Sequence, residues 1–128
     1  MEVSLMINTT TELNNPLLQE WMDRLRLNDW VIKVNFNCSP NDMILKDVCG
    51  ETEWDEVNKC AKINIIDKKD YGDRIVPFDE EKTLVHELLH LKFSLLGENE
   101  NELQNRLVHQ LIDDLAKALI DAKKELSK

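Results

Sequence analysis

The spacing of hydrophobic positions changes several times along the chain, and each change marks an element. Near the start, apolar side chains recur every three or four residues, as on an α-helix with one buried face: Leu17, Leu18, Trp21, Met22 and Leu25. Asn15 followed by Pro16 is typical of an N-cap with proline at the first helical position. The pattern predicts a first helix over Pro16–Leu27, with Trp21 in the core.

After Asn28-Asp29 the period changes from 3.6 to 2. Apolar residues alternate with their neighbours in a way that predicts a half-buried strand: Trp30, Ile32, Val34 and Phe36. Ser39-Pro40-Asn41-Asp42 predicts a turn. A second strand is expected within Val48–Trp54 and a third over Ala61–Asp67. The link Asp55–Lys59 is short enough to join them as an antiparallel hairpin, and Lys68–Pro77 is expected to be a surface loop.

Two helices complete the predicted fold. The run Glu80–Leu96 has helical periodicity, with Asp79 as its N-cap and Gly97 as its C-terminal stop. A long helix over about 102–125 carries a nearly continuous apolar stripe, widened by Val108 and Ile112: Leu103, Leu107, Leu111, Leu115, Ala118, Leu119, Ala122 and Leu126. We therefore expect one α+β domain over 1–128 with a small, three-stranded twisted sheet, and residues 1–12 as a loose arm.

Composition narrows the range of partners. The chain has 128 residues and a net charge of −9, which argues against binding nucleic acid or an anionic membrane. We expect no membrane span and no signal peptide, and hence a cytoplasmic protein. Three cysteines, Cys38, Cys49 and Cys60, form no Cys-x-x-Cys pair, and we expect them to be reduced and not to bind metal.

The candidate chemistry lies in His86-Glu87-Leu88-Leu89-His90, an HExxH pattern. Residues four apart lie on the same face of a helix, so two imidazoles can bind one Zn²⁺. A glutamate beside the first histidine can then take a proton from metal-bound water. The alternative is an ordinary amphipathic helix with two solvent-facing histidines.

His109, the third and last histidine, lies on the predicted long helix, about 60° around it from Ile112. An antiparallel pair of helices would bring it level with His86 and His90 and complete three ligands for one zinc ion per chain. The competing third ligand is Glu102, with Glu98 and Glu100 as further acidic candidates. Asp113, one turn after His109, either fixes the tautomer of a ligand histidine or is a solvated charge.

The order of elements and four segments resemble the minimal zincin peptidases, the minigluzincin and SprT-like proteins of bacteria and phages. The resemblance covers roughly 30–119 and is carried by Trp30-Val31-Ile32-Lys33-Val34, Gly50-Glu51-Thr52-Glu53-Trp54, Ala61-Lys62-Ile63-Asn64-Ile65 and Thr83–Leu91. In the similar gluzincins the third ligand is a glutamate on the following helix, with an acidic residue one turn later. His109 and Asp113 match those positions, with histidine in place of glutamate.

The resemblance implies zinc-dependent hydrolysis of a peptide or protein, with Glu87 as general base. Tyr71, the only tyrosine, is a candidate donor to the oxyanion. The edge strand of the hairpin is expected to bind an extended peptide. Two alternatives remain: a zinc-binding regulatory or interaction protein, in a phage or toxin–antitoxin setting, and a latent peptidase whose cleft is filled by its own terminal segment. The sequence leaves the oligomeric state open.

Overall fold

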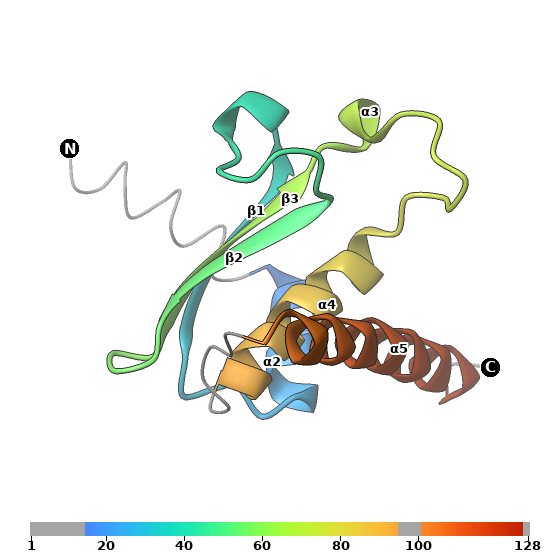
Figure 1. The fold of residues 1–128 in the computed structure, drawn as a ribbon. Helices are drawn as coiled ribbons and strands as arrows, with labels where there is room; N and C mark the ends of the chain where they lie inside the picture. Colours follow the sequence, from blue (N-terminus) through green and yellow to red (C-terminus); the bar gives the residue numbers. More distant parts are fainter. Residues whose placement is uncertain (1–14, 95–100, 127–128) are drawn as a thin grey trace.

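The computed structural model describes residues 15–94 and 101–126 and has the predicted α+β architecture (Figure 1). A helix precedes a three-stranded sheet, and a single helical turn and two longer helices follow it. In chain order the elements are α2 (Pro16–Arg24), β1 (Val31–Cys38), the 3₁₀ turn η1 (Pro40–Asp42), β2 (Gly50–Asp55), β3 (Cys60–Ile66), α3 (Lys68–Tyr71), α4 (Glu80–Phe93) and α5 (Glu102–Leu126).

Helix α2 begins where the sequence predicts and ends earlier. The Asn15 side chain accepts hydrogen bonds from the backbone N–H groups of Leu17 and Leu18, and Pro16 occupies the first turn. At the other end, Arg26 adopts a left-handed φ of 59°, and the Leu27 N–H donates to the Met22 carbonyl at 2.8 Å. This hydrogen bond, from residue 27 back to residue 22, caps the C-terminal end of the helix. The left-handed position before it, here Arg26, is more often occupied by glycine. The predicted end at Leu27 is therefore wrong, although Leu27 is buried.

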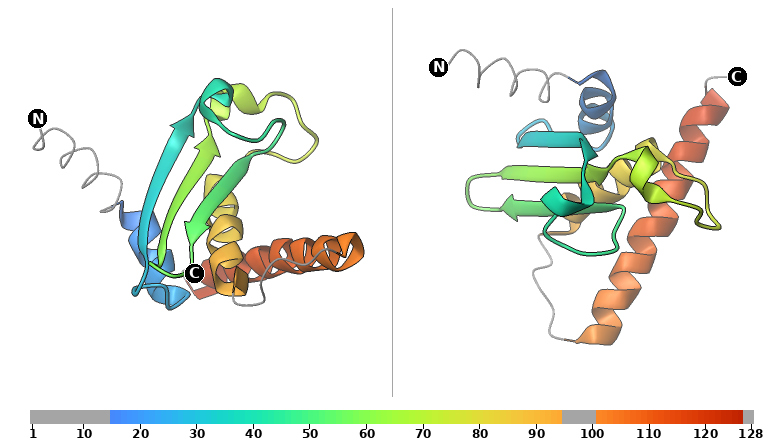
Figure 2. Two further views of the ribbon diagram at one scale, coloured as in Figure 1. Left: turned by 60° about the vertical axis from the view of Figure 1, so that its left-hand side comes forward. Right: turned by 90° about the horizontal axis from the view of Figure 1, so that it is seen from above.

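The sheet has the order β1-β3-β2, so β2 is an edge strand. Strands β2 and β3 form the predicted antiparallel hairpin, whereas β1 pairs with β3 in parallel. The face that carries Ile32, Val34, Ile63 and Ile65 packs into the main core together with side chains of the helices. Figure 2 shows the three strands side by side, with α4 against the sheet and α5 beyond it. Among the described elements, β2 lies next to α4.

Helices α4 and α5 contact each other in opposite chain order, as predicted. His90 lies near His109, and Lys82, earlier in α4, lies near Asp113, later in α5. Figure 2 shows that α5 crosses α4 obliquely and extends past it.

A polar network fixes this crossing near the C-terminal end of α5. Lys123 of α5 donates to Glu20 of α2 and to Glu81 of α4, and Trp21 Nε1 donates to the same Glu81 at 2.7 Å. Trp21 is 1% exposed, as expected for a core residue. The network joins all three helices that surround the core.

Two further details of the fold differ from prediction. The expected loop Lys68–Pro77 contains one helical turn, α3, which begins where the Asp67 side chain accepts from the Lys69 N–H. In α5, the buried residues are Ile112, Ala116 and Ile120, whereas the leucines of the apolar stripe other than Leu119 face solvent. The Asp79 N-cap of α4 is confirmed, and its side chain accepts from the Lys82 N–H.

Three sequence-based predictions fall on residues that the structure leaves undescribed. They are the loose arm over 1–12, the Gly97 stop and the last residues of the predicted 80–96 helix. Within the described ranges, no helix combines the length and the apolar character needed to cross a lipid bilayer.

Candidate metal centre

The three histidines converge on one point between α4 and α5. One ring nitrogen from each of His86, His90 and His109 lies within 4.8 Å of the others. The ring centroids of His86 and His109 are 4.6 Å apart, and those of His90 and His109 are 5.5 Å apart. Nitrogens bound about 2.0–2.1 Å from a tetrahedral zinc lie roughly 3.4 Å from one another, a difference that side-chain rotation can close. The three-histidine group can hold one metal ion.

Asp113 of α5 lies close to the Nδ1 atom of His86. Its Oδ1 lies 3.5 Å from His86 Nδ1 and 3.4 Å from the Lys82 ammonium group. A carboxylate at Nδ1 favours the tautomer that carries its proton there, which leaves Nε2 as the metal-binding nitrogen. Asp113 therefore lies where a residue that fixes a histidine tautomer is expected. It contacts His86 of α4 rather than His109, which lies on the same helix as Asp113.

Burial keeps His86 and His90 in the form that binds metal. Burial lowers the pKa of His86, with a further decrease from the neighbouring His109, while Asp113 opposes the shift. Burial, together with His86 and His109, lowers the pKa of His90 to about 4. Both imidazoles are thus neutral near pH 7, as a metal ligand must be.

Glu87 lies under the edge strand rather than in solvent. Its side chain is 7% exposed, and its Oε1 accepts a hydrogen bond of 2.5 Å from the Thr52 hydroxyl on β2. Burial raises the pKa of Glu87 to about 7; the Thr52 hydrogen bond opposes this shift and the nearby charge of Glu51 adds to it. A carboxyl group with a pKa near neutrality is suited to accept and return a proton.

Glu51 connects β2 to the loop that precedes it. Its carboxylate accepts from the backbone N–H groups of Ile44 and Leu45 and, at 2.7 Å, from the side chain of Asn64. Burial alone would raise the pKa of Glu51, but these hydrogen bonds outweigh it and the pKa lies below its usual value. Glu51 therefore stays ionised beneath the start of β2, where it holds the loop in place.

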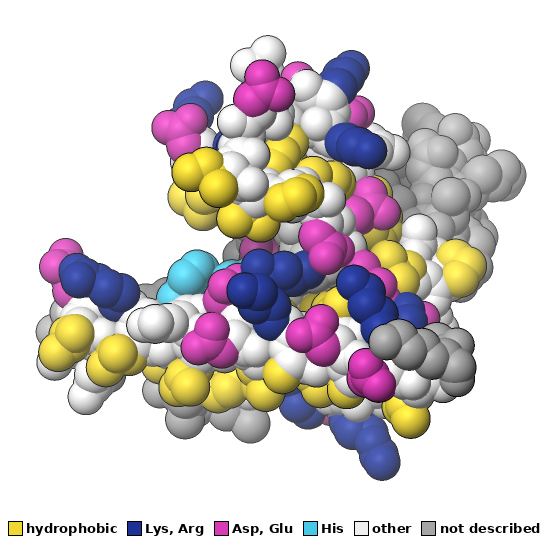
Figure 3. Space-filling view, turned by 90° about the vertical axis from the view of Figure 1, so that its right-hand side faces the viewer, with side chains coloured by type: hydrophobic (Ala, Val, Ile, Leu, Met, Phe, Trp, Pro, Cys, Tyr) yellow, Lys and Arg dark blue, Asp and Glu magenta, His cyan; other side chains and the backbone are white. Residues whose placement is uncertain are grey.

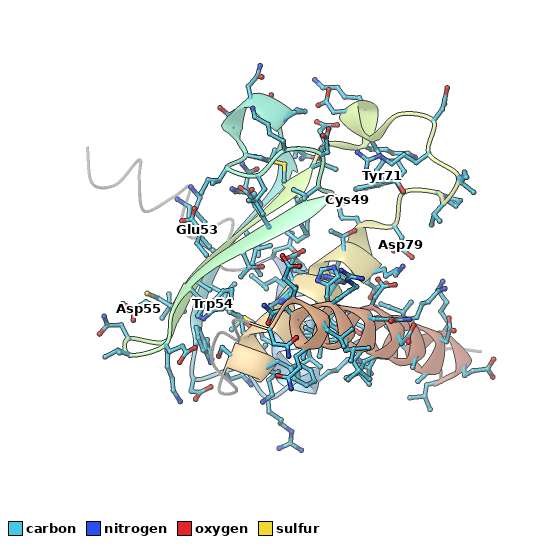
Figure 4. All side chains as sticks on the ribbon, in the orientation of Figure 1. Cys49, Glu53, Trp54, Asp55, Tyr71 and Asp79 are labelled. Atoms are coloured by element: carbon cyan, nitrogen blue, oxygen red, sulfur yellow. The ribbon has the colours of Figure 1, made fainter. Side chains whose placement is uncertain are left out.

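A cleft of about 320 Å³ opens above the histidines and is lined by His86, Glu87, His109, Asp113 and residues of β2 and the loop before α4. Figure 3 shows histidine surface in the hollow between α5 and the apolar surface above it. In Figure 4, Cys49, Tyr71 and Asp79 surround the upper end of this region, whereas Trp54 and Asp55 lie at the far end of β2. The cleft thus has polar groups at its floor and an apolar upper wall that includes Val48, Val76 and Pro77.

Tyr71 lines the cleft, but its hydroxyl is already used. It donates to the Val76 carbonyl at 2.5 Å, and its ring packs edge-on against Phe78. As an oxyanion donor, Tyr71 would first have to release this bond.

The competing ligand Glu102 begins α5 and is not part of the histidine group in the described residues, while Glu98 and Glu100 lie outside them. The cysteines are all free, as expected, and Cys49 contacts the Arg74 guanidinium group at 3.1 Å.

Sequence reasoning missed the two β2 residues that position Glu87. A side chain at Gly50 would place its Cβ 3.0 Å from Glu87 Oε2 and 2.9 Å from Thr83 Cγ2, so only glycine fits there without movement. Thr52 supplies the hydroxyl on the other carboxylate oxygen. The alternation along 50–54 gave no signal of this contact, because it depends on how β2 crosses α4.

Comparison of the chain with protein families, curated proteins and solved structures finds no match.

Proposed function

We propose that the protein is a zinc-dependent peptidase with a minimal zincin-like architecture. The observation that supports this most directly is the convergence of three imidazoles beside a buried glutamate at the floor of an open cleft. A metal held only for structure has its coordination closed by protein ligands, whereas a catalytic zinc keeps three protein ligands and one open position. Three histidines supply the second type of set.

The residues of the chain divide the chemistry between them. His86, His90 and His109 would hold the zinc ion, and Asp113 would keep His86 in its binding tautomer. When bound, zinc supplies Lewis acidity that polarises a scissile carbonyl and makes water easier to deprotonate. Glu87 takes the proton from the attacking water and returns it to the leaving amine, while Thr52 orients its carboxylate.

The substrate of this proposal is an extended peptide. Strand β2 is the edge of the sheet, and it borders the cleft through Gly50. An edge strand offers unpaired backbone groups to which a peptide can add by β-augmentation. The apolar upper wall favours a hydrophobic side chain next to the cleaved bond.

One observation favours a second candidate, a zinc-binding protein that has no turnover or is latent. The hydroxyl of Tyr71, the one tyrosine of the chain, is bound to the Val76 carbonyl. Without another donor, an oxyanion would be stabilised only by the metal. This candidate shares the zinc site with the first and differs in activity.

Two measurements test these candidates, and the second separates them. Elemental analysis of protein purified without added metal should find close to one zinc per chain. Less than about a third of an equivalent, with no gain on zinc addition, would contradict both candidates. The wild-type protein should then cleave members of a peptide library, and Glu87→Gln should retain zinc but lose at least about 100-fold in rate.

The matched control is Glu53→Gln, which removes an exposed carboxylate from the same strand that covers Glu87. It should cleave like wild type. A zinc-loaded wild-type protein that cleaves nothing would support the non-catalytic or latent candidate.

A further inference from the structure

Helix α5 exposes a row of apolar side chains on the side away from the core. The row, called here the leucine row, has spacings of four or three residues: Leu103, Leu107, Leu111, Leu115, Ala118, Ala122 and Leu126. Its leucines are between 41% and 80% exposed. Figure 3 shows the resulting hydrophobic band along the lower side of α5.

The length and regularity of the row distinguish it from scattered surface leucines. The 25-residue helix is about 37 Å long at 1.5 Å per residue, and the row follows it from end to end. Soluble monomers rarely expose contiguous apolar surface on this scale unless it is used for binding. Apolar residues spaced by four or three residues over more than three heptads are typical of a helix that packs against another helix.

We propose that the leucine row is a homodimer interface, in which α5 of two copies pack antiparallel. If Leu103 of one copy lies opposite Leu126 of the other, Leu107 lies opposite Ala122 and Leu111 opposite Ala118. The row reads almost the same in both directions, so a two-fold axis near 114–115 maps it onto itself. Leu107 and Leu111 then each face an alanine, whereas Leu103 faces Leu126 and the two Leu115 side chains lie close to the axis.

Charge supports a second copy as the occupant and favours the antiparallel direction. In this alignment Arg106 lies two positions from Asp121 of the second copy, and Lys117 lies two positions from Asp114.

The net charge of the helix points the same way. Helix α5 carries four basic and five acidic residues, whereas the chain as a whole has a net charge of −9. It is therefore a surface on which two acidic chains can meet with little repulsion.

The interface is separate from the candidate metal centre. Leu111 follows His109 by two residues, which places it about 160° away around the helix. The cleft of each copy therefore stays open in the dimer. The proposed dimer does not depend on whether the protein is a peptidase.

The test is the mass of the particle in solution. At micromolar concentration the full chain should sediment with twice its monomer mass of 15.0 kDa. Leu111→Glu should sediment as a monomer with unchanged helical circular dichroism, because Leu111 is 58% exposed in a single copy. If this variant unfolds, Ala118→Glu tests the same contact. The control is Val57→Glu, a change at a 91% exposed position between β2 and β3, which should remain dimeric.

Cross-linking tests the direction of the helices. With Cys49 and Cys60 replaced by serine, Leu111→Cys combined with Ala118→Cys should form an intermolecular disulfide under mild oxidation, and Leu111→Cys alone should not. Efficient cross-linking of the single variant would overturn the antiparallel pairing. A wild-type monomer would overturn the dimer. If the wild-type protein were a monomer and deletion of residues 1–14 increased its binding of an apolar dye, the occupant of the row would be the N-terminal segment of the same chain.

Discussion

The hydroxyl of Thr52 donates a hydrogen bond of 2.5 Å to Oε1 of Glu87, and so connects the edge strand to the helix that carries two of the three histidines. The two residues are 35 positions apart in the sequence. Because Glu87 is buried, this bond holds its carboxylate in one orientation and favours the ionised form, which is the form a general base requires.

Thr52→Val should therefore slow peptide cleavage by about 10- to 100-fold, the effect of removing a hydrogen bond to a charged group. Thr52→Ser keeps the hydroxyl and should remain close to wild type. The loss should fall mainly on kcat, with zinc content unchanged. Thr83→Val is the matched control, since the Thr83 hydroxyl donates to the Asp79 carbonyl in its own helix and not to Glu87. Equal losses in Thr52→Val and Thr52→Ser would show that the hydroxyl has no role.

Gly50→Ala tests the other side of the same carboxylate. The added methyl group would lie 3.0 Å from Glu87 Oε2 and 2.9 Å from Thr83 Cγ2, so either the glutamate or the threonine must move. We expect a loss of at least about 10-fold in activity and about 1–3 kcal/mol in the free energy of unfolding.

The control for Gly50→Ala is Gly72→Ala. Gly72 has a left-handed φ of 79° and open space around it, so alanine there should destabilise the fold through backbone strain alone. Its activity should persist under conditions where the protein is folded. If both variants lost activity to the same degree, the effect of Gly50→Ala would be one of stability and not of position.

Local signals predicted the parts of the fold that depend on neighbouring residues. Asn15 and Asp79 are N-caps as expected, and the β2–β3 hairpin follows from its short link. The HExxH spacing and a single further histidine were enough to predict the cluster, because a helix places residues four apart on one face.

Features that depend on packing between distant segments were missed. The parallel pairing of β1 with β3 joins strands that are separated in the sequence by β2, and no local pattern encodes it. The apolar stripe of α5 is not the buried face, because Ile112, Ala116 and Ile120 form a second apolar face that packs on the core. A helix with two apolar faces does not reveal from its sequence which face is buried. The early end of α2 depends on Arg26 in a left-handed conformation that non-glycine residues seldom adopt.

The assignment of His109 as third ligand can be tested by comparing zinc affinities. His109→Ala should weaken zinc binding by at least about 100-fold, because it removes one of three converging imidazoles. Glu102→Ala should have little effect, since position 102 is at the start of α5, about 10 Å along the helix axis from position 109. Competition with a chromophoric chelator measures both affinities. The reverse order would transfer the ligand role to Glu102.

The metal-free protein should show an effect of Glu87 on stability that depends on pH. The pKa of Glu87 is about 7 in the folded protein, against an ordinary value of 4.5. Between these two values the unfolded chain releases the proton while the folded chain keeps it, so the free energy of unfolding falls as pH rises from about 4.5 to 7. The loss contributed by this group amounts to at most about 3 kcal/mol. Above pH 7 it is constant.

Glu87→Gln cannot lose a proton, so this variant should gain stability relative to wild type as pH rises from 5 to 8. The lowered pKa values of His86 and His90 act in the opposite direction, since they reduce stability as pH falls. They are present in both proteins and largely cancel in the comparison. Urea denaturation of chelator-treated protein at the two pH values measures the difference, and Glu53→Gln, at an exposed position, should show no such gain. If Glu87→Gln followed wild type at both pH values, the Glu87 carboxylate would not be desolvated beneath β2 in solution.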